Sequence, residues 1–255
     1  MKRSKWALPY FIFLVLFVLL PLIIIAVYAF RATDGTFTMS NISAFFTKPT
    51  IVKTFWRSME IAVENTLICL LIGYPVAFIL ADKNLNKSAF TAILFILPMW
   101  INALMRTIAT AEIFHAAGLA LGRGSLLFGM AYDYLPFMIY PIYTVLNKMD
   151  KSYSEAARDL GASSFKAFTK VTLPLSLPGI MSGIMMVFMP TVSTFAVAEI
   201  LTRNKIQLFG SLINEQFNNM MWGQGAALSL IMLVIVGLTT LLPTGEAEET
   251  EGGTI

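Results

Sequence analysis

Charged side chains are scarce in this chain. They make up 13% of its 255 residues, about half the share found in a typical soluble domain. Hydrophobic residues make up 57%, and the mean hydropathy is +0.73. Long stretches carry no charge at all. A soluble protein can form its core without such uncharged runs, whereas a membrane-spanning helix needs them. The composition therefore excludes an ordinary soluble protein and predicts an integral membrane protein.

Cysteine and histidine are almost missing. Cys69 is the one cysteine and His115 the one histidine, so the sequence predicts neither a disulfide nor a metal site. No Walker A pattern, Gly-x-x-x-x-Gly-Lys-Ser/Thr, and no nucleophilic triad arrangement is present. We therefore expect no catalytic residues and no cofactor bound by this chain. The net charge of +3 is small and spread out, which argues against a nucleic-acid partner.

Six hydrophobic stretches are long enough to cross a bilayer as helices. They lie at about residues 6–30, 58–81, 90–114, 125–146, 179–201 and 223–242. Pro98 is expected to kink the third stretch. Six crossings place both termini on one side, and the basic residues 1–5 indicate that this side is the cytoplasm. Residues 243–255 are acidic and glycine-rich, which predicts a disordered tail.

The longest polar interval between two of these stretches spans residues 152–178. Ser152 and Glu155 have the Ser-x-x-Glu spacing of a capping box, so a short helix is expected to begin there. Gly161 can adopt the left-handed conformation that ends such a helix. The topology places this interval on the cytoplasmic side.

A second short helix is expected in the same interval. Ser163 or Ser164 can cap its start, and Pro174 is expected to end it. Two short capped helices between membrane spans indicate an element that another protein contacts.

The same interval resembles the cytoplasmic EAA loop of ABC-importer permeases, whose pattern is Glu-Ala-Ala, three residues, Gly, nine residues and Ile-x-Leu-Pro. This chain departs from that pattern only by having Val171 for Ile. The resemblance implies an all-α membrane protein whose six transmembrane helices, within residues 6–242, have the type I ABC importer (MetI-like) permease fold. It also implies that the loop couples the spans to a partner ATPase through Glu155, Ala156, Ala157, Asp159, Gly161, Leu173 and Pro174.

Within this family the chain is most similar to the membrane subunits of spermidine/putrescine importers, especially the first of the two. The supporting segments are LPYFIFLVLFVLLPL at 8–22, GYPVA at 73–77, LPMWINALMRT at 97–107, YLPFMIYPIY at 134–143 and WGQGAALS at 222–229. Two departures are a short connection between the third and fourth stretches and the absence of paired glycines after Glu199. Both would lie on the face that meets a binding protein.

The resemblance implies a set of partners in a bacterial inner (plasma) membrane. They are a second, homologous permease subunit in a heterodimer, a dimer of cytoplasmic ATPases that binds ATP and Mg, an extracytoplasmic polyamine-binding protein, and membrane lipid. Three alternatives stay open: a permease for another small cation or an iron complex, a secondary transporter or channel that works without ATP, and an integral-membrane enzyme.

Polar residues within the stretches are candidates for a cargo pathway, because they are costly at membrane depth and usually face a cavity or a partner. A polyamine is an extended polycation, and its ammonium groups bind both carboxylates and aromatic faces. The alternative is that these residues are interfacial or form structural ion pairs. Arg106 should be neutralised, by Glu112 or by the partner subunit. The candidates are Trp100, Asn102, Glu112, Asp133, Phe195 and Glu199.

Overall fold

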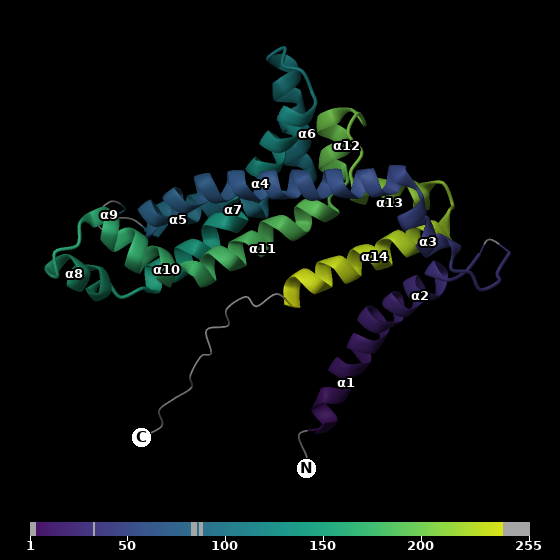
Figure 1. Ribbon diagram of the computed structural model, residues 1–255, viewed down its shortest axis with the longest axis horizontal. Coiled ribbons are helices and arrows are strands. Elements are labelled where there is room, and N and C mark those ends of the chain that lie inside the picture. The colour runs from purple at the N-terminus through teal and green to yellow at the C-terminus, as the bar shows by residue number, and fades with distance from the viewer. Residues whose placement is uncertain (1–3, 33, 83–85, 87–88, 242–255) are drawn as a thin grey trace. The chain divides into compact units, whose positions relative to one another are not determined.

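The computed structural model describes residues 4–32, 34–82, 86 and 89–241, and these residues are almost entirely helical (Figure 1). An isolated β-bridge joins Arg31 to Phe37. The prediction of an all-α protein is confirmed. The chain divides into two compact units, Met1–Arg57 with Leu208–Thr239, and Ser58–Gln207 with Thr240–Ile255. The predicted tail, residues 243–255, lies outside the described residues.

The first unit begins with one long apolar helix, made of α1 (Ser4–Leu14), the π-helical turn η1 (Val15–Leu19) and α2 (Leu20–Ala29). It continues with α3 (Ser40–Thr47), the start of α4 (Pro49–Ala81), α13 (Phe209–Asn218) and α14 (Trp222–Leu241). The rings of Phe45, Phe55 and Phe209 pack edge to face in its core. Ala29 of α2 is buried with Ala226 and Ala227 of α14, because small side chains let helices approach closely.

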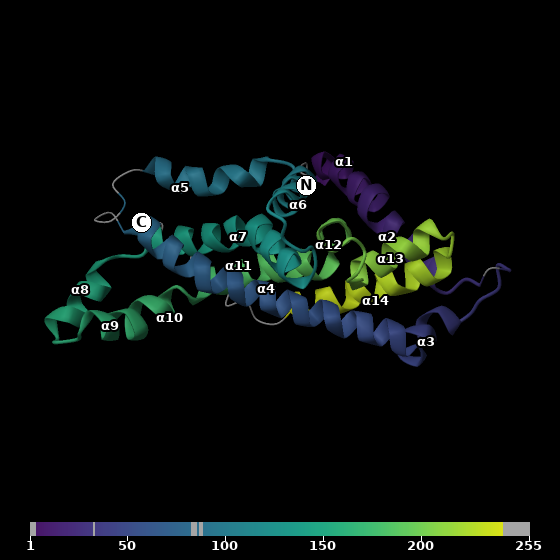
Figure 2. The same cartoon turned by 90° about the horizontal axis from the view of Figure 1, so that it is seen from above.

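The second unit contains the rest of α4 and ten further helical elements. They are α5 (Ala89–Ile96), the 3-10 turn η2 (Leu97–Trp100), α6 (Ala103–Ala116), α7 (Arg123–Lys148), α8 (Ser152–Asp159), α9 (Ser164–Ala167), the π-helical turn η3 (Phe168–Thr172), α10 (Leu173–Leu175), α11 (Leu177–Ser193) and α12 (Ala196–Thr202). Figure 2 shows α7 and α11 side by side.

Glycine sets the contact between α7 and α11. Gly179 and Gly183 lie four residues apart on α11, which is the spacing typical of close helix packing in membranes. A Cβ at Gly179 would lie 3.0 Å from the carbonyl oxygen of Pro141, and one at Gly183 would lie 2.7 Å from Sδ of Met138. The core beside this contact includes Cys69, Met138 and Val187.

The helix boundaries differ from the expected stretches in three places. The helix expected at 58–81 begins nine residues earlier, at Pro49. The stretch expected at 90–114 is two helical segments bent by 98°, and the break falls at Ile101–Asn102 rather than at Pro98. The stretch expected at 179–201 is broken at Thr194–Phe195 between α11 and α12.

Among the described residues, two helices are long and apolar enough to cross a membrane by themselves, Pro9–Ala29 and Pro49–Ala81. Two bent pairs also qualify if each pair is one span: Ile93–Trp100 with Ala103–Ala116, and Ser164–Leu175 with Leu177–Ser193.

Candidate functional site

The first helix of the polar interval, α8, begins at Ser152 as the sequence predicts, but by a different cap. The Asp150 carboxylate accepts a hydrogen bond of 2.9 Å from the Ser152 backbone N–H. Ser152 is the first helical residue and not the cap, so the predicted capping box with Glu155 is wrong. An acidic residue two positions upstream does the capping instead. The hydrogen bonds from Ser152 lower the pKa of the Asp150 carboxyl below its usual value.

The end of α8 confirms the role predicted for glycine. Gly161 has φ of +84°, the left-handed region that glycine enters without steric cost. Its N–H donates to the Arg158 carbonyl at 2.8 Å, and the Ala162 N–H donates to the Ala157 carbonyl at 3.0 Å. These two bonds form a Schellman motif. Ser163 then caps α9 by accepting a bond of 3.3 Å from the Lys166 N–H.

Pro174 does not end the second helix, and that prediction is wrong. The helix continues from Ser164 to Leu175 and bends by 62° into α11 at Ser176. The wide π-helical turn η3 ends just before Leu173-Pro174, as η1 ends just before Leu20-Pro21. Proline has no backbone N–H to donate to the preceding turn. The wider hydrogen-bond spacing of a π turn accommodates this missing donor, so the chain stays helical through both Leu-Pro pairs.

The second helix of the loop is fastened to the rest of its unit by aromatic and polar contacts. The Phe168 ring packs edge to face on Tyr74 and Phe78 of α4, with ring centroids 5.9 and 5.6 Å apart. The Tyr74 hydroxyl and the buried Ser176 hydroxyl are hydrogen bonded at 3.0 Å. Leu173 packs against the core of the unit. These contacts connect the second helix of the loop to α4 and to the start of α11.

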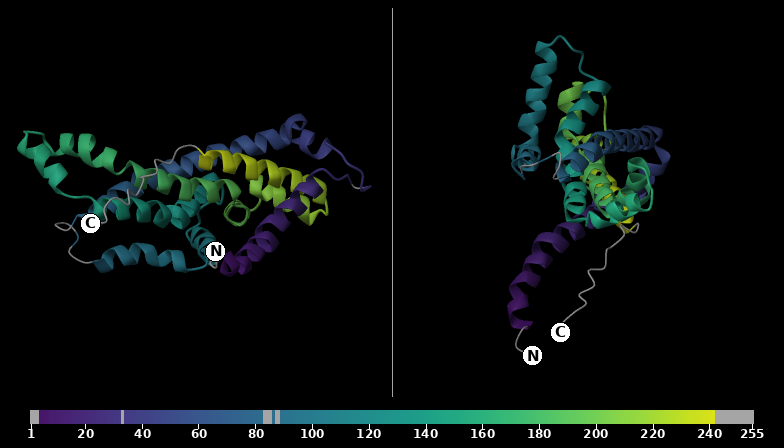
Figure 3. Two further views of the ribbon diagram at one scale, coloured as in Figure 1. Left: turned by 90° about the horizontal axis from the view of Figure 1, so that it is seen from below. Right: turned by 90° about the vertical axis from the view of Figure 1, so that its left-hand side faces the viewer.

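The opposite side of the loop is exposed and carries large apolar side chains. Leu160 is 88% exposed and Phe165 is 75% exposed. Figure 3 shows α8 to α10, in green, at one end of their unit. Leu173 and Ala157 are half-buried, whereas the other predicted coupling residues are exposed: Glu155, Ala156, Asp159, Gly161 and Pro174.

A groove of about 550 Å³ lies between α8, α9–η3 and the ends of α4 and α7, and the exposed Phe165 is part of its lining. Its lining includes Glu155, Arg158 and Phe168. Lys151 at its edge forms an ion pair of 3.2 Å with Asp82 at the end of α4. The groove thus combines both signs of charge with apolar walls.

The structure gives Arg106 a different partner from the predicted one. Its Nε lies 3.3 Å from Oδ1 of Asp133, and the two side chains are 6% and 1% exposed. Oδ2 of Asp133 accepts a hydrogen bond of 3.0 Å from the Thr107 hydroxyl. Glu112, the predicted partner within the chain, is exposed. Asp133 is thus a buried residue in the middle of α7.

The remaining pathway candidates have varied surroundings. Trp100 is 85% exposed on η2, and Asn102 caps α6 by accepting a bond of 2.9 Å from the Leu104 N–H. Phe195 is exposed at the start of α12, and Glu199 within α12 is half-buried. Figure 1 shows α12 beside α6, and α12 also packs on α7, so three elements that carry candidates meet.

Sequence reasoning missed a second charged cluster. Arg123, at the start of α7, pairs with Glu60 at 2.6 Å and with Glu64 at 2.7 Å, both on α4. The spacing of the two glutamates by one helical turn is visible in the sequence, but their partner is not. Their hydrogen bonds raise the pKa of Arg123, which is half-exposed.

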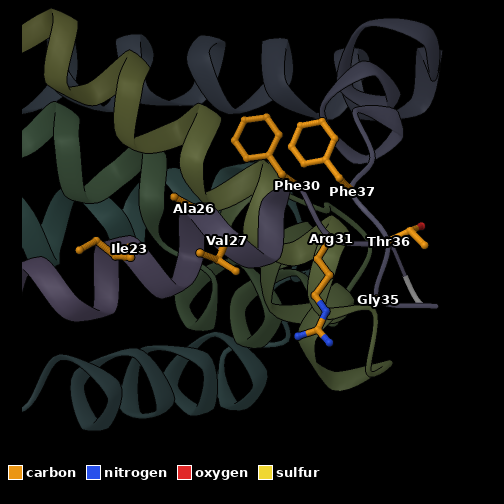
Figure 4. Close-up of a pocket in the computed structure, with 8 residues that line it drawn as sticks. All are labelled: Ile23, Ala26, Val27, Phe30, Arg31, Gly35, Thr36 and Phe37. Carbon is orange, nitrogen blue, oxygen red and sulfur yellow. The ribbon is translucent and has the colours of Figure 1, made fainter.

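Two further pockets contain none of the predicted site residues. One, of about 580 Å³, lies between α2 and the turn that follows it (Figure 4), and the Phe30 and Phe37 rings stack at 5.7 Å beside it. The other, of about 400 Å³, is lined by residues 118–121 and by the basic side chains of His115, Arg203 and Lys205.

The sequence matches the family described as "Binding-protein-dependent transport system inner membrane component" over residues 3–243. It is 32% identical to the spermidine/putrescine transport system permease protein PotB of Haemophilus influenzae, with 89% of this chain and 88% of the relative covered. It is 33% identical to the protein of that name from Escherichia coli K12, with 90% and 92% covered.

Two solved structures share the fold. One is a bacterial ABC transporter involved in the import of the acidic polysaccharide alginate, with a TM-score of 0.72, 20% identity, and 94% of this chain and 96% of that chain covered. The other is the MetNI methionine ABC transporter in an inward-facing conformation, with a TM-score of 0.62, 15% identity, and 76% and 94% covered. At these identities the likeness shows the fold alone.

Proposed function

The chain belongs to the family of binding-protein-dependent transport system inner membrane components, and we propose that it is a permease subunit of an ATP-driven polyamine importer. It is a multi-pass protein of the inner membrane. The observation that carries the proposal is the identity of 32–33% over about nine-tenths of the chain to permeases named for spermidine and putrescine. The fastened loop at residues 152–178 supports the coupling role.

The proposed topology has six crossings, at about residues 6–30, 58–81, 90–114, 125–146, 179–201 and 223–242, with both termini in the cytoplasm. The basic residues 1–5 support this orientation. The bent pair Ile93–Trp100 with Ala103–Ala116 supports a third crossing that is broken rather than straight. The break between α11 and α12 falls within the proposed fifth crossing.

The proposed mechanism is alternating access. A cytoplasmic ATPase dimer binds ATP and Mg and contacts the exposed side of α8. Closure of that dimer moves the loop, and the contacts of Phe168 with α4 and the bend at Ser176 pass this motion to the spans. A second, homologous permease completes the pathway, and an extracytoplasmic polyamine-binding protein delivers the cargo.

Cargo contact is proposed for side chains on η2, α6, α7 and α12 and at their ends. Carboxylates and aromatic rings are the groups that bind ammonium ions. The proposed set is Trp100, Asn102, Glu112, Asp133, Phe195 and Glu199. Uptake by alanine variants of Glu112, Asp133 and Glu199 tests the set, and unchanged kinetics in all three would contradict it.

The decisive experiment is ATP hydrolysis by the reconstituted complex over a panel of cargo-loaded binding proteins. We expect spermidine or putrescine to stimulate hydrolysis and to be taken up. Stimulation by an iron complex or another small cation alone would mean that this is the cargo instead of a polyamine, and uptake without any ATPase would indicate a secondary transporter.

Glu155→Lys should abolish uptake while the protein stays in the membrane, because it reverses a charge on the exposed side of α8.

A further inference from the structure

The ion pair between Arg106 and Asp133 is buried but incomplete. Besides the approach of 3.3 Å between Nε and Oδ1, Nη2 of Arg106 donates a long bond of 3.4 Å to the Asp133 backbone carbonyl. Among the described residues, Nε and Nη1 of Arg106 and Oδ1 of Asp133 make no hydrogen bond. A guanidinium has five N–H donors in a planar fork, and its strong pairs with carboxylates are bidentate. This pair is not bidentate, and among the described residues Nη2 is the guanidinium nitrogen that makes a hydrogen bond.

Such a pair is poorly suited to a purely structural role. Burying two charges is favourable only when good geometry and additional hydrogen bonds satisfy both groups. The contacts of Arg123 with Glu60 and Glu64 are shorter than that of the buried pair, at 2.6 and 2.7 Å. They are shorter even though these side chains are exposed to water, which can solvate their charges. The buried pair is therefore the one with the longer and less complete contact.

The surroundings of Asp133 are those that an ammonium group requires. Its Oδ1 is free of hydrogen bonds among the described residues, and its Oδ2 is held by the Thr107 hydroxyl. The Tyr132 ring lies 5.6 Å from the Arg106 guanidinium carbon and offers a face for a cation. Arg106 occupies this site from a different helix, α6, four residues beyond the break at Asn102.

We propose that Arg106 is an internal stand-in for a cargo ammonium group: in this conformation it occupies the Asp133 carboxylate, and the polyamine displaces it during transport. The proposal rests on the proposed function. It gives Arg106 a role in release, because the returning guanidinium competes with the bound ammonium. A relative movement of α6 and α7 exchanges the two cations without leaving Asp133 unpaired.

Neutralising Arg106 should then tighten cargo binding and slow cargo release. The test is binding of labelled spermidine to the complete complex in nanodiscs without nucleotide, together with KM and kcat of uptake. For Arg106→Met we expect at least about a tenfold gain in spermidine affinity, with KM and kcat both lowered. Asp133→Asn should show no such gain, because it removes the carboxylate for which the two cations compete. In the double variant Arg106→Met/Asp133→Asn, the gain seen with Arg106→Met should be lost.

A matched control and a milder variant keep the test decisive. Arg123→Gln breaks the exposed cluster and should leave spermidine binding unchanged. If Arg106→Met and Asp133→Asn assemble but do not alter spermidine affinity, the pair is structural and the proposal is overturned. If neither assembles, Thr107→Val decides, because it leaves both charges in place and removes the hydroxyl that bonds to Oδ2 and to the Ala103 carbonyl of its own helix. A raised KM for spermidine supports the proposal, and an unchanged KM overturns it.

The two proposals fail in different ways. If the wild-type complex takes up no polyamine from any binding protein, the proposed function is wrong. If the wild type takes up spermidine but its affinity is indifferent to Arg106 and Thr107, only the stand-in role of Arg106 is wrong.

Discussion

The loop at 152–178 and the buried cluster of Arg106, Thr107 and Asp133 hold their charged residues in opposite ways. In the loop the charges are exposed, and the geometry comes from a glycine turn, an aspartate cap and aromatic contacts. In the cluster the contact between helices is the ion pair itself, and its two charged side chains are almost completely buried. The loop should therefore be sensitive to changes of backbone and rings, and the cluster to changes of charge.

The largest effect is expected from Asp133→Leu. It leaves the Arg106 charge buried without a partner, which costs about 3–5 kcal/mol of stability. The double variant Arg106→Met/Asp133→Leu should recover most of that loss, because no buried charge remains. Thermal unfolding of the complex in nanodiscs measures both. The matched change Arg123→Leu at the exposed cluster should cost at most about 1 kcal/mol. Equal losses at the two sites would remove the contrast between buried and exposed charges.

The next effect is expected from Phe168→Ala, which removes both edge-to-face contacts with Tyr74 and Phe78. Two such aromatic pairs contribute about 1–3 kcal/mol together. We expect the ATPase to remain bound and to hydrolyse ATP while uptake falls, because the loop is no longer fastened to α4. Phe165→Ala is the control on the same helix. Its exposed ring should affect ATPase binding and not the fastening. If both variants lose ATPase binding, the two sides of the loop are not separate.

Features encoded by neighbouring residues were predicted well in the loop. Gly161 and the Ser163 cap could be read from the sequence, because each depends on residues within a few positions. The capping box failed because Asp150, two residues before the Ser-x-x-Glu motif, accepts a hydrogen bond from the same N–H. Pro174 failed as a helix stop because a π turn compensates for it, and no local signal in the sequence announces that turn.

The buried cluster could be predicted only in part. Its members were recognised as costly at membrane depth, but Arg106 was assigned to Glu112 or a partner subunit instead of Asp133. Sequence spacing reveals pairs within one helix, whereas Arg106 and Asp133 lie 27 residues apart on α6 and α7. The 98° bend before α6, which was expected at Pro98, directs this helix onto α7 and α12. Such pairings depend on packing between helices, which a single sequence does not display.

A smaller loss of stability is expected from Gly161→Val. A side chain at φ of +84° costs about 1–2 kcal/mol, and no atom lies within 4 Å of the added Cβ, so the penalty comes from the backbone alone. Distortion of the turn should displace α8 and abolish ATPase binding, which co-purification measures. Gly118→Val is the matched control, because Gly118 has φ of +69° and equal free space in the α6–α7 connection. Wild-type uptake by Gly161→Val would mean that the loop is only a linker.

The smallest effect is expected from Asp150→Ala, which tests whether an exposed charge matters to the loop at all. The pKa of Asp150 is lowered by its bonds from Ser152, so its charged form stabilises α8 above the ordinary carboxyl pKa of about 3.9. This contribution fades only as the pH falls through the lowered pKa, so the hydrogen-exchange protection of α8 should be constant from about pH 5 to 8. Asp150→Ala should lower that protection slightly, and Asp150→Asn, which still caps, should lower it less. Protection that changes with pH within this range would mean that another titrating group holds the start of α8, and the loop would then share the charge dependence of the buried cluster.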